Sequence, residues 1–199
     1  QTSISSIKDS EGKITHFLAI KEDITGRKNI EMQLICLAEN DPLTNLFNRR
    51  RFRQELEHWV AHAQRHGVKG ALLFLDLDNF KYINDTLGHL VGDEILIRFA
   101  DLLRERMREG DILARLGGDE FAIILPYTSE SEAQLIAREI LKLVRKRIYE
   151  NEKTKHLIIT VSVGIVLFPK HGNDTEALLT YADLAMYKAK EEGRNRITV

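Results

Sequence analysis

Residues 112–125 read ILARLGGDEFAIIL, two short apolar runs on either side of a polar GGDE turn. Two strands joined by so tight a turn must pair antiparallel, because a parallel pair needs a crossover connection of a dozen or more residues. Gly117 and Gly118 suit the turn, since glycine adopts positive φ without steric cost, and they leave the backbone open to a ligand. The predicted hairpin therefore presents two acids, Asp119 and Glu120, at its turn.

Outward from this hairpin, strand-like and helix-like segments alternate. Continuous apolar or β-branched runs predict strands, and apolar residues at helical spacing predict helices. Alternating elements with one antiparallel pair indicate an α/β (α+β) sandwich of the ferredoxin-like kind, in which helices cover a mainly antiparallel sheet. The predicted strands are 70–77, 112–116, 121–125, 157–168 and 196–199, and the predicted helices are 52–60, 93–107, 131–144 and 177–192.

The first part of the chain predicts a separate β-hairpin over residues 3–24. Apolar residues precede and follow a turn cluster, DSEG at residues 9–12, in which glycine permits the backbone that a turn needs. Two strands alone are marginal in water. We therefore expect this hairpin to be the end of a domain whose remainder is missing from the chain.

A helical pattern follows over residues 27–40, with Ile30, Leu34 and Leu37 spaced like one seam of a coiled coil. Two heptads fit a coiled coil and an amphipathic linker helix packed on its own domain equally well. The helix is expected to stop at Asp41-Pro42, because the residue before a proline is biased out of the α region.

The composition is that of an ordinary globular chain, with 43% hydrophobic and 30% charged residues among 199. Lys and Arg total 29 against 30 Asp and Glu, a balance that does not favour DNA or RNA as a partner. The single cysteine, Cys36, excludes an internal disulfide and fits a reducing compartment. No apolar run approaches the roughly 20 residues that span a bilayer, no signal peptide is visible, and the start at Gln1 leads us to expect a fragment.

A predicted strand runs into acidic residues where residues 72–78 read LLFLDLD. Side chains alternate along a strand, so Asp76 and Asp78 lie on one face. Either the strand has reached solvent and both acids are hydrated, or a cation compensates buried carboxylates. Because Asp119 and Glu120 also adjoin an apolar strand expected to be central, converging carboxylates would form a site for Mg²⁺ and for metal-assisted phosphoryl or nucleotidyl transfer.

Two cations stand near the end of the last predicted helix. Lys190 and Arg194 are four residues apart and are expected to share a face where the helix ends near Gly193. Such a pair could contact phosphate, but cations at a helix C-terminus also complement the helix dipole. This feature alone leaves both explanations open.

Four motifs in a fixed order together resemble the GGDEF family, whose members make cyclic di-GMP. The resemblance runs from about Asp41 to Val199 and implies a sandwich of the nucleotidyl-cyclase palm type. Four signatures at the expected separations are far more specific than any one of them. The motifs are DPLT with NRR at 41–44 and 48–50, DLDNFKYIND at 76–85 with GH at 88–89 and GD at 92–93, GGDEF at 117–121, and YKAK with GRNR at 187–190 and 193–196.

The resemblance implies a role for each residue of the acidic sites. Asp76 and Asp119 match the metal-binding carboxylates, and Leu77 would lend its backbone carbonyl to the same ion. Asp119 and Glu120 belong to the catalytic turn. Mg²⁺, with Mn²⁺ as an alternative, is the implied cofactor.

The resemblance also implies a substrate site for GTP. Asn84 and Asp93 match the residues that hold guanine, and a carboxylate suits guanine because it accepts hydrogen bonds from N1–H and N2–H. His89 matches a position near the substrate and fits a structural histidine equally well. The other implied substrate-binding residues are Lys81, Gly117, Gly118 and the phosphate-contacting pair Lys190 and Arg194.

Two further features concern regulation and departures from the family pattern. Arg108 and Asp111 form an Arg-x-x-Asp at the offset of the family's inhibitory site for cyclic di-GMP, and an ordinary surface pair is the alternative. Asn45 and Phe47 stand where the opening motif more often has Gly and Pro. Asparagine tolerates left-handed backbone, so we expect the turn to survive.

Residues 1–26 resemble the end of a PAS sensor domain, and DITGRK at 23–28 resembles its exit into a signalling helix. The expected organisation is a PAS remnant over 1–26, a linker helix over 27–40 and a catalytic domain over 41–199.

The resemblance implies a cytoplasmic bacterial enzyme, active as a homodimer, that condenses two GTP into cyclic di-GMP and releases two pyrophosphates. The alternative is a silent GGDEF domain that serves as a nucleotide receptor or dimerisation module. Damage at Asp76, Asp119 or Glu120 would indicate such a domain, and these residues are intact. An enzyme for another nucleotide is a third hypothesis, against which Asn84 and Asp93 argue.

Overall fold

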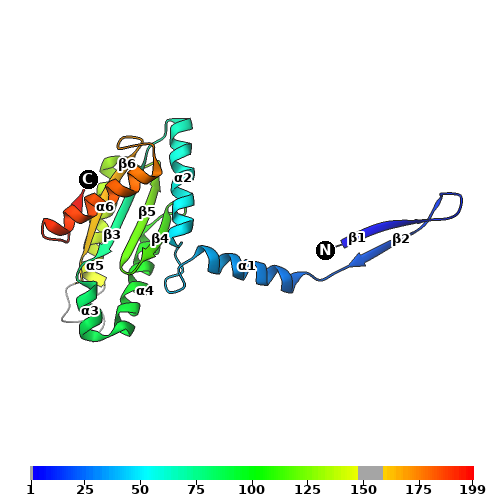
Figure 1. Ribbon diagram of the computed structural model, residues 1–199, viewed down its shortest axis with the longest axis horizontal. Coiled ribbons are helices and arrows are strands. Elements are labelled where there is room, and N and C mark those ends of the chain that lie inside the picture. Colours follow the sequence, from blue (N-terminus) through cyan, green and yellow to red (C-terminus); the bar gives the residue numbers. More distant parts are fainter. Residues whose placement is uncertain (1, 148–158) are drawn as a thin grey trace. The chain divides into compact units, whose positions relative to one another are not determined.

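The computed structural model describes residues 2–147 and 159–199. The chain divides into two compact units, Gln1–Ala38 and Glu39–Val199 (Figure 1). The smaller unit holds a β-hairpin and most of one helix, and the larger unit holds a five-stranded sheet with its covering helices. Within the described ranges, no helix combines the length and the apolar character needed to cross a membrane.

The predicted N-terminal hairpin is present in the first unit. Strands β1 (Thr2–Lys8) and β2 (Ile14–Lys21) pair antiparallel. Asp9 closes the turn, because its Oδ1 accepts the N–H of Glu11 at 3.0 Å, and Gly12 takes the expected positive φ of 82°.

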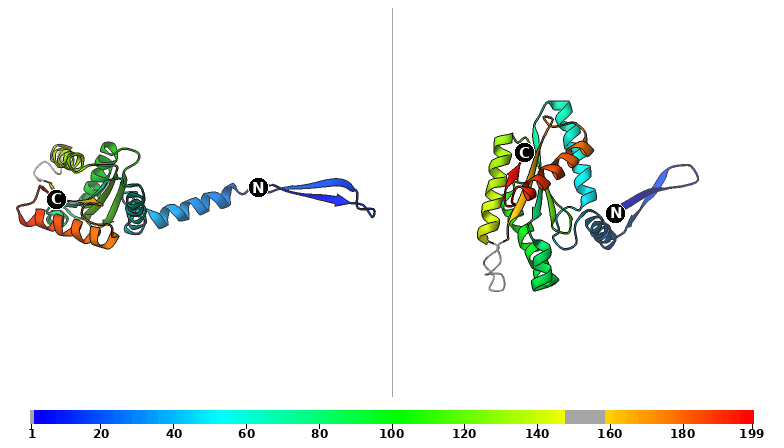
Figure 2. Two further views of the ribbon diagram at one scale, coloured as in Figure 1. Left: turned by 90° about the horizontal axis from the view of Figure 1, so that it is seen from above. Right: turned by 60° about the vertical axis from the view of Figure 1, so that its left-hand side comes forward.

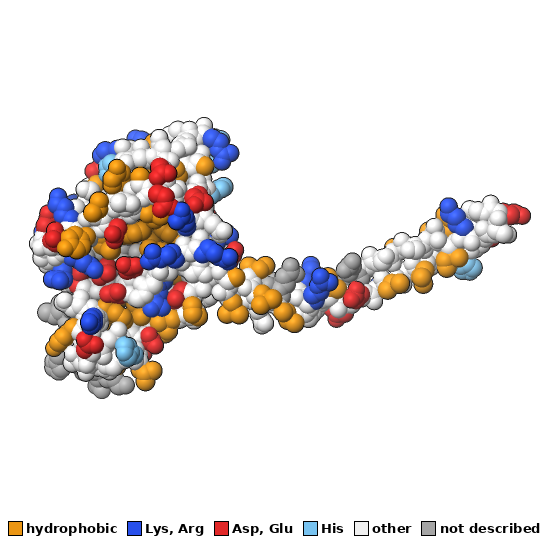
Figure 3. Space-filling view, in the orientation of Figure 1, with side chains coloured by type: hydrophobic (Ala, Val, Ile, Leu, Met, Phe, Trp, Pro, Cys, Tyr) orange, Lys and Arg blue, Asp and Glu red, His pale blue; other side chains and the backbone are white. Residues whose placement is uncertain are grey.

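Helix α1 (Thr25–Glu39) follows the hairpin and ends before Asp41-Pro42, as predicted. Its apolar seam is open: Ile30, Leu34 and Leu37 are all exposed. Hydrophobic side chains are visible along both the hairpin and α1 in Figure 3. The described residues of this unit therefore leave apolar surface that the unit itself does not bury.

The second unit is built on a sheet with the strand order β4-β5-β3-β6-β7. All pairs are antiparallel except β6 with β7, so the predicted fold class is confirmed. β3 lies at the centre and all eight of its residues are buried, as expected for a strand covered on both faces. The strands are β3 (Gly70–Leu77), β4 (Ile112–Gly117), β5 (Glu120–Pro126), β6 (Val161–Phe168) and β7 (Ile197–Thr198).

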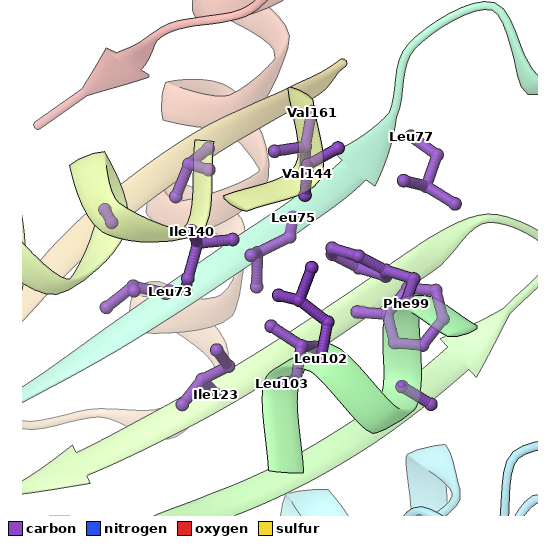
Figure 4. Close-up of a cluster of buried hydrophobic side chains, with 14 of the residues drawn as sticks. Leu73, Leu75, Leu77, Phe99, Leu102, Leu103, Ile123, Ile140, Val144 and Val161 are labelled. Atoms are coloured by element: carbon purple, nitrogen blue, oxygen red, sulfur yellow. The ribbon is translucent and has the colours of Figure 1, made fainter. Parts of the chain in front are cut away.

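Helices cover both faces of this sheet (Figures 1 and 2). Alternate residues of β3 supply the two cores: Leu73 and Leu75 pack with α3, α4 and α5, whereas Leu72 and Phe74 pack with α2 and α6. Figure 4 shows the first of these cores around Phe99 and Leu103. The helices are α2 (Arg49–His66), α3 (Phe80–Leu87), α4 (His89–Arg106), α5 (Glu130–Arg147) and α6 (Thr175–Glu191).

Some predicted boundaries differ from the structure. Helix α3 had no counterpart among the predicted elements, because it has only eight residues and begins just after Asn79, whose φ is 60°. The strand predicted over 157–168 begins at Val161, and residues 157–158 lie outside the described ranges. Asn45 has the positive φ, 56°, that its place in the opening motif led us to expect.

Candidate active site

Asp76 stands near the C-terminal end of the central strand β3. Its register partners are Glu120 at the start of β5 and Ser162 on β6, so these three side chains lie on the sheet face that α2 and α6 cover. Asp76 is 5% exposed and Asp78 is 1% exposed. The interpretation that both acids are hydrated is therefore wrong.

Lys190 compensates the buried charge of Asp76. Its Nζ lies 2.7 Å from Oδ2 of Asp76, at the point where the last turn of α6 meets the end of β3. The pKa of Asp76 is raised to about 6, chiefly by burial and also by the neighbouring Asp119 and Asp78, and Lys190 offsets part of this rise. A carboxylate this deeply buried is costly without a cation beside it, so Asp76 depends on Lys190 remaining in place.

Asp78 has a structural role that the sequence reasoning missed. Its carboxylate accepts the hydroxyls of Thr160 at 2.6 Å and Ser162 at 2.7 Å. It also accepts the backbone N–H of Asn195 at 3.0 Å. Asp78 thus ties the end of β3 to the start of β6 and to the segment after α6. Its partners lie 82 to 117 residues away, so no local signal could have identified them.

The turn between β4 and β5 carries the predicted catalytic residues, Asp119 and Glu120. Gly117 and Gly118 have positive φ values of 142° and 52°, as predicted, and a Cβ at either glycine would meet open space. The backbone carbonyl of Asp119 accepts the N–H of Leu77 at 3.3 Å, which joins the turn to the end of β3. Asp119 is half-buried beside Asp76, so the structure brings these two carboxylates to the same edge of the sheet.

Two arginines hold this turn, and neither was predicted. Arg49, at the start of α2, donates to Glu120 Oε2 and to the carbonyl of Leu116, each at 3.1 Å. Arg115 donates to the carbonyl of Gly118 from Nε at 3.0 Å and from Nη2 at 2.8 Å.

Arg115 also reaches the opening motif. Its Nη1 lies 3.1 Å and 3.2 Å from the two carboxylate oxygens of Asp41. Asp41 in turn accepts the N–H and the hydroxyl of Thr44 at 2.8 and 2.7 Å. Partial burial raises the pKa of Asp41, but the bonds from Thr44 and Arg115 outweigh it and lower the pKa below its ordinary value.

The predicted guanine residues lie on the helical pair α3–α4 that follows β3. Asn84 is on α3, and its Oδ1 is buried without a hydrogen-bond partner in the described part of the chain. Gly92 on α4 lies against that oxygen so closely that a Cβ there would stand 1.9 Å from it. Asp93 is the next residue and is exposed, so an unpaired acceptor and an open carboxylate come from neighbouring helices.

The other predicted substrate residues are more exposed. Lys81 is on α3, and His89 is the first residue of α4. The prediction that Lys190 and Arg194 share a helix face is wrong. Helix α6 ends at Glu191, and Arg194 lies beyond Gly193 with a φ of 61°.

A pocket of about 410 Å³ opens beside Glu120 on the α2–α6 face of the sheet. Among the described residues, Arg49, Phe74 and Thr180 contribute to its lining, and Asn84 and Asp93 do not. The pocket therefore adjoins the turn between β4 and β5 and is separate from the predicted guanine position.

The predicted regulatory pair lies at the opposite end of β5. Arg108 Nε is 3.0 Å from Asp111 Oδ1, and Arg108 Nη2 donates to the carbonyl of Pro126 at 2.6 Å. Glu120 and Pro126 are the two ends of β5, which puts them about 20 Å apart at the rise of an extended strand. Arg108 and Asp111 line a separate pocket of about 210 Å³.

Within the described ranges, no cluster of three or more His, Cys, Asp or Glu side chains is arranged to hold a metal ion by itself. Acidic and basic side chains are interspersed over the face of the second unit in Figure 3.

Residues 38–196 match the family model for the diguanylate cyclase, GGDEF domain. The chain belongs to the GGDEF family.

Curated relatives of this GGDEF chain are much longer proteins. The cyclic di-GMP phosphodiesterase PdeR of Escherichia coli K12 is 37% identical over 194 residues, 97% of this chain and 29% of PdeR. The diguanylate cyclase DgcP of Pseudomonas aeruginosa PAO1 is 44% identical over 164 residues, 81% of this chain and 24% of DgcP. The chain spans less than a third of either relative, and their names divide between a phosphodiesterase and a cyclase.

Solved structures support the GGDEF fold independently. The GGDEF domain of PA1120 (YfiN or TpbB) from Pseudomonas aeruginosa matches with a TM-score of 0.74 and 40% identity, over 78% of this chain and 96% of that one. The coiled coil and GGDEF domain of DgcB from Caulobacter crescentus, in complex with c-di-GMP, matches with a TM-score of 0.80 and 33% identity. That match covers 88% of this chain and 92% of the DgcB chain.

Proposed function

We propose that this chain is a diguanylate cyclase that condenses two GTP into cyclic di-GMP with release of two pyrophosphates. One observation carries the proposal: the buried carboxylate of Asp76 faces Glu120 across the β3–β5 pair, beside Asp119, with a cation already held against it. A silent GGDEF domain has no need to keep this costly arrangement of buried charge.

The donor set of the site fits a hard divalent cation. Carboxylates of Asp76 and Asp119 with the carbonyl of Leu77 are oxygen ligands, which Mg²⁺ and Mn²⁺ prefer. The ammonium of Lys190 against Asp76 supports the fit, because this carboxylate already stabilises a positive charge. When bound, the ion would lower the pKa of the attacking hydroxyl and neutralise charge on the phosphates.

The residues of this chain would hold the nucleotide at both ends. The unpaired Oδ1 of Asn84 and the carboxylate of Asp93 are acceptors for the N–H groups of guanine. Lys190 and Arg194, with Lys81, would contact phosphate, and the open backbone at Gly117 and Gly118 would let phosphate approach the turn. His89 would lie near the substrate.

The reaction needs two copies of the site. The 3′-hydroxyl oxygen of one GTP forms a bond to the α-phosphorus of the other, and the bond from that phosphorus to pyrophosphate breaks. The hydroxyl proton passes to a carboxylate of the turn or to water. The same exchange in the other direction closes the ring. Asp119 and Glu120 stand at the turn where this hydroxyl would lie. A homodimer is therefore the proposed active form, in the cytoplasm of a bacterium.

The rest of the chain would control that dimer. We assign residues 1–26 to a PAS remnant, 27–40 to a signalling linker and 41–199 to the catalytic domain. The exposed apolar residues of the hairpin and of α1 support the first two assignments, because each surface requires a partner. Cyclic di-GMP bound at Arg108 and Asp111 would inhibit from the far end of β5.

The experiment that tests the proposal is incubation of the chain with GTP and Mg²⁺, followed by mass spectrometry of the products. Cyclic di-GMP is expected from the unmodified chain and not from Asp119→Ala. If a forced dimer of the unmodified chain also gives no cyclic di-GMP, the silent receptor becomes the better account.

A further inference from the structure

Two carboxylates of the candidate site, those of Glu120 and Asp76, each have a cationic partner, and the two ion pairs differ in burial. The pair of Glu120 and Arg49 is open to solvent, with side chains 41% and 69% exposed. The pair of Asp76 and Lys190 is shielded, with side chains 7% and 31% exposed. Exposed pairs are screened and weak, whereas a shielded carboxylate depends on its counter-ion. Lys190 is therefore the cation that compensates the buried carboxylate of Asp76 in the chain without ligands.

The same ammonium stands in the way of a metal ion. An oxygen ligand of Mg²⁺ lies about 2 Å from the ion. Because Lys190 Nζ is 2.7 Å from Oδ2 of Asp76, an ion on that oxygen would be within about 5 Å of the ammonium and would repel it. The lysine stem is flexible and Lys190 is partly exposed, so the ammonium can leave without unfolding α6.

We propose that Lys190 is an exchangeable counter-ion that makes metal binding depend on nucleotide. In the chain without ligands it occupies the cation position at Asp76 and opposes metal entry. Nucleotide phosphate gives the ammonium a second anionic partner, and its departure opens Asp76 to the metal. This inference rests on the proposed function of the site and makes Lys190 a positioning residue for the metal as well as a phosphate contact.

The test is binding of Mn²⁺ to the chain without nucleotide, measured by calorimetry on the unmodified protein and on Lys190→Met. Removal of the ammonium is expected to tighten Mn²⁺ binding at least tenfold. Lys188→Met is the matched control, because Lys188 lies in the same last turn of α6 and its ammonium is 3.9 Å from Glu192. That control is expected to bind Mn²⁺ like the unmodified chain.

Three further measurements keep the result specific. Lys190→Arg retains the charge and is expected to retain the weak binding. Asp76→Asn combined with Lys190→Met is expected to lose the gain, which assigns it to Asp76. A non-hydrolysable GTP analogue is expected to tighten Mn²⁺ binding to the unmodified chain more than to Lys190→Met. Circular dichroism on each variant checks that it is folded.

Equal or weaker Mn²⁺ binding by a folded Lys190→Met protein would overturn the inference. Its failure and that of the proposed function are distinguishable. If the unmodified chain makes cyclic di-GMP and Lys190→Met does not bind Mn²⁺ more tightly, the cyclase stands and the counter-ion role is wrong. If Lys190→Met binds Mn²⁺ more tightly and no dimer makes cyclic di-GMP, the counter-ion role stands and the cyclase proposal is wrong.

Discussion

Arg115 and Asp41, which are 74 residues apart in the chain, form a shielded ion pair with side chains 11% and 16% exposed. The same guanidinium holds the carbonyl of Gly118, so one side chain connects the opening motif to the turn between β4 and β5. Asp41 lies two residues after the end of α1. Arg115 therefore links the segment just after α1 to the Gly117–Glu120 turn.

Replacement of Arg115 by Met is expected to damage both stability and catalysis. Breaking a shielded pair costs about 3 kcal/mol, and the freed turn should lower kcat at least tenfold. Urea unfolding and the initial rate of GTP consumption measure the two effects. Arg53→Met is the control, because the ion pairs of Arg53 with Glu57 and Glu176 are exposed and should contribute less than about 1 kcal/mol. Equal effects of both substitutions would contradict the assignment.

The lowered pKa of Asp41 adds a pH dependence. A carboxyl whose pKa is lower in the folded state stabilises the fold above its ordinary pKa, about 4, and this contribution is lost as the pH falls. Asp41→Asn is therefore expected to unfold more easily than the unmodified chain at neutral pH. The difference should shrink at pH values below about 4, and a difference that grows there would contradict the sign.

For Asp76 the dependence of stability on pH has the opposite sign to that for Asp41. Its pKa is raised from 3.8 to about 6 in the folded state, so the ionised form destabilises the fold, and stability is lost as the pH rises between these values. In EDTA without nucleotide, Asp76→Asn should be more stable than the unmodified chain by about 2–3 kcal/mol at pH 7.5 and nearly equal at pH 4. Urea unfolding at both pH values tests this, with exposed Asp183→Asn as the control.

Substitution of Gly92 tests the predicted guanine position, and substitution of Gly164 serves as its control for stability. A Cβ at Gly92 would displace the end of the Asn84 side chain, whereas a Cβ at Gly164 would meet the backbone of α6 at 2.4 Å. Gly92→Ala should therefore weaken GTP binding at least tenfold with little loss of stability. Gly164→Ala should destabilise the fold by about 2–3 kcal/mol. Unchanged GTP affinity in Gly92→Ala would remove Asn84 from the guanine site.

Feedback inhibition should depend on Arg108. Arg108→Ala removes the guanidinium that lies between Asp111 and Pro126, so the concentration of cyclic di-GMP for half-inhibition should rise at least tenfold. The initial rate before product accumulates should change little, because the pair is at the far end of β5 from Glu120. Arg98→Ala, an exposed arginine of α4, is the control. Unaltered inhibition in Arg108→Ala would indicate that Arg108 and Asp111 are an ordinary surface ion pair with no regulatory role.

Local patterns in the sequence predicted most of the fold. The buried run of β3 and the glycine turn before β5 each have a one-dimensional signature, and both are where the sequence places them. Contacts between distant segments have no such signature. The satisfied carboxylate of Asp78, the Arg115–Asp41 pair and the place of Arg194 beyond α6 all depend on how segments far apart in the chain meet, so the structure was needed to find them.

The stoichiometry of the reaction tests the central claim most directly. Pyrophosphate and cyclic di-GMP are measured in one reaction with GTP and Mg²⁺, over a range of protein concentrations. Diguanylate cyclase activity predicts two pyrophosphates for each cyclic di-GMP, with a rate per protomer that rises with concentration. Inorganic phosphate without cyclic di-GMP, or no turnover even by a forced dimer, would contradict it.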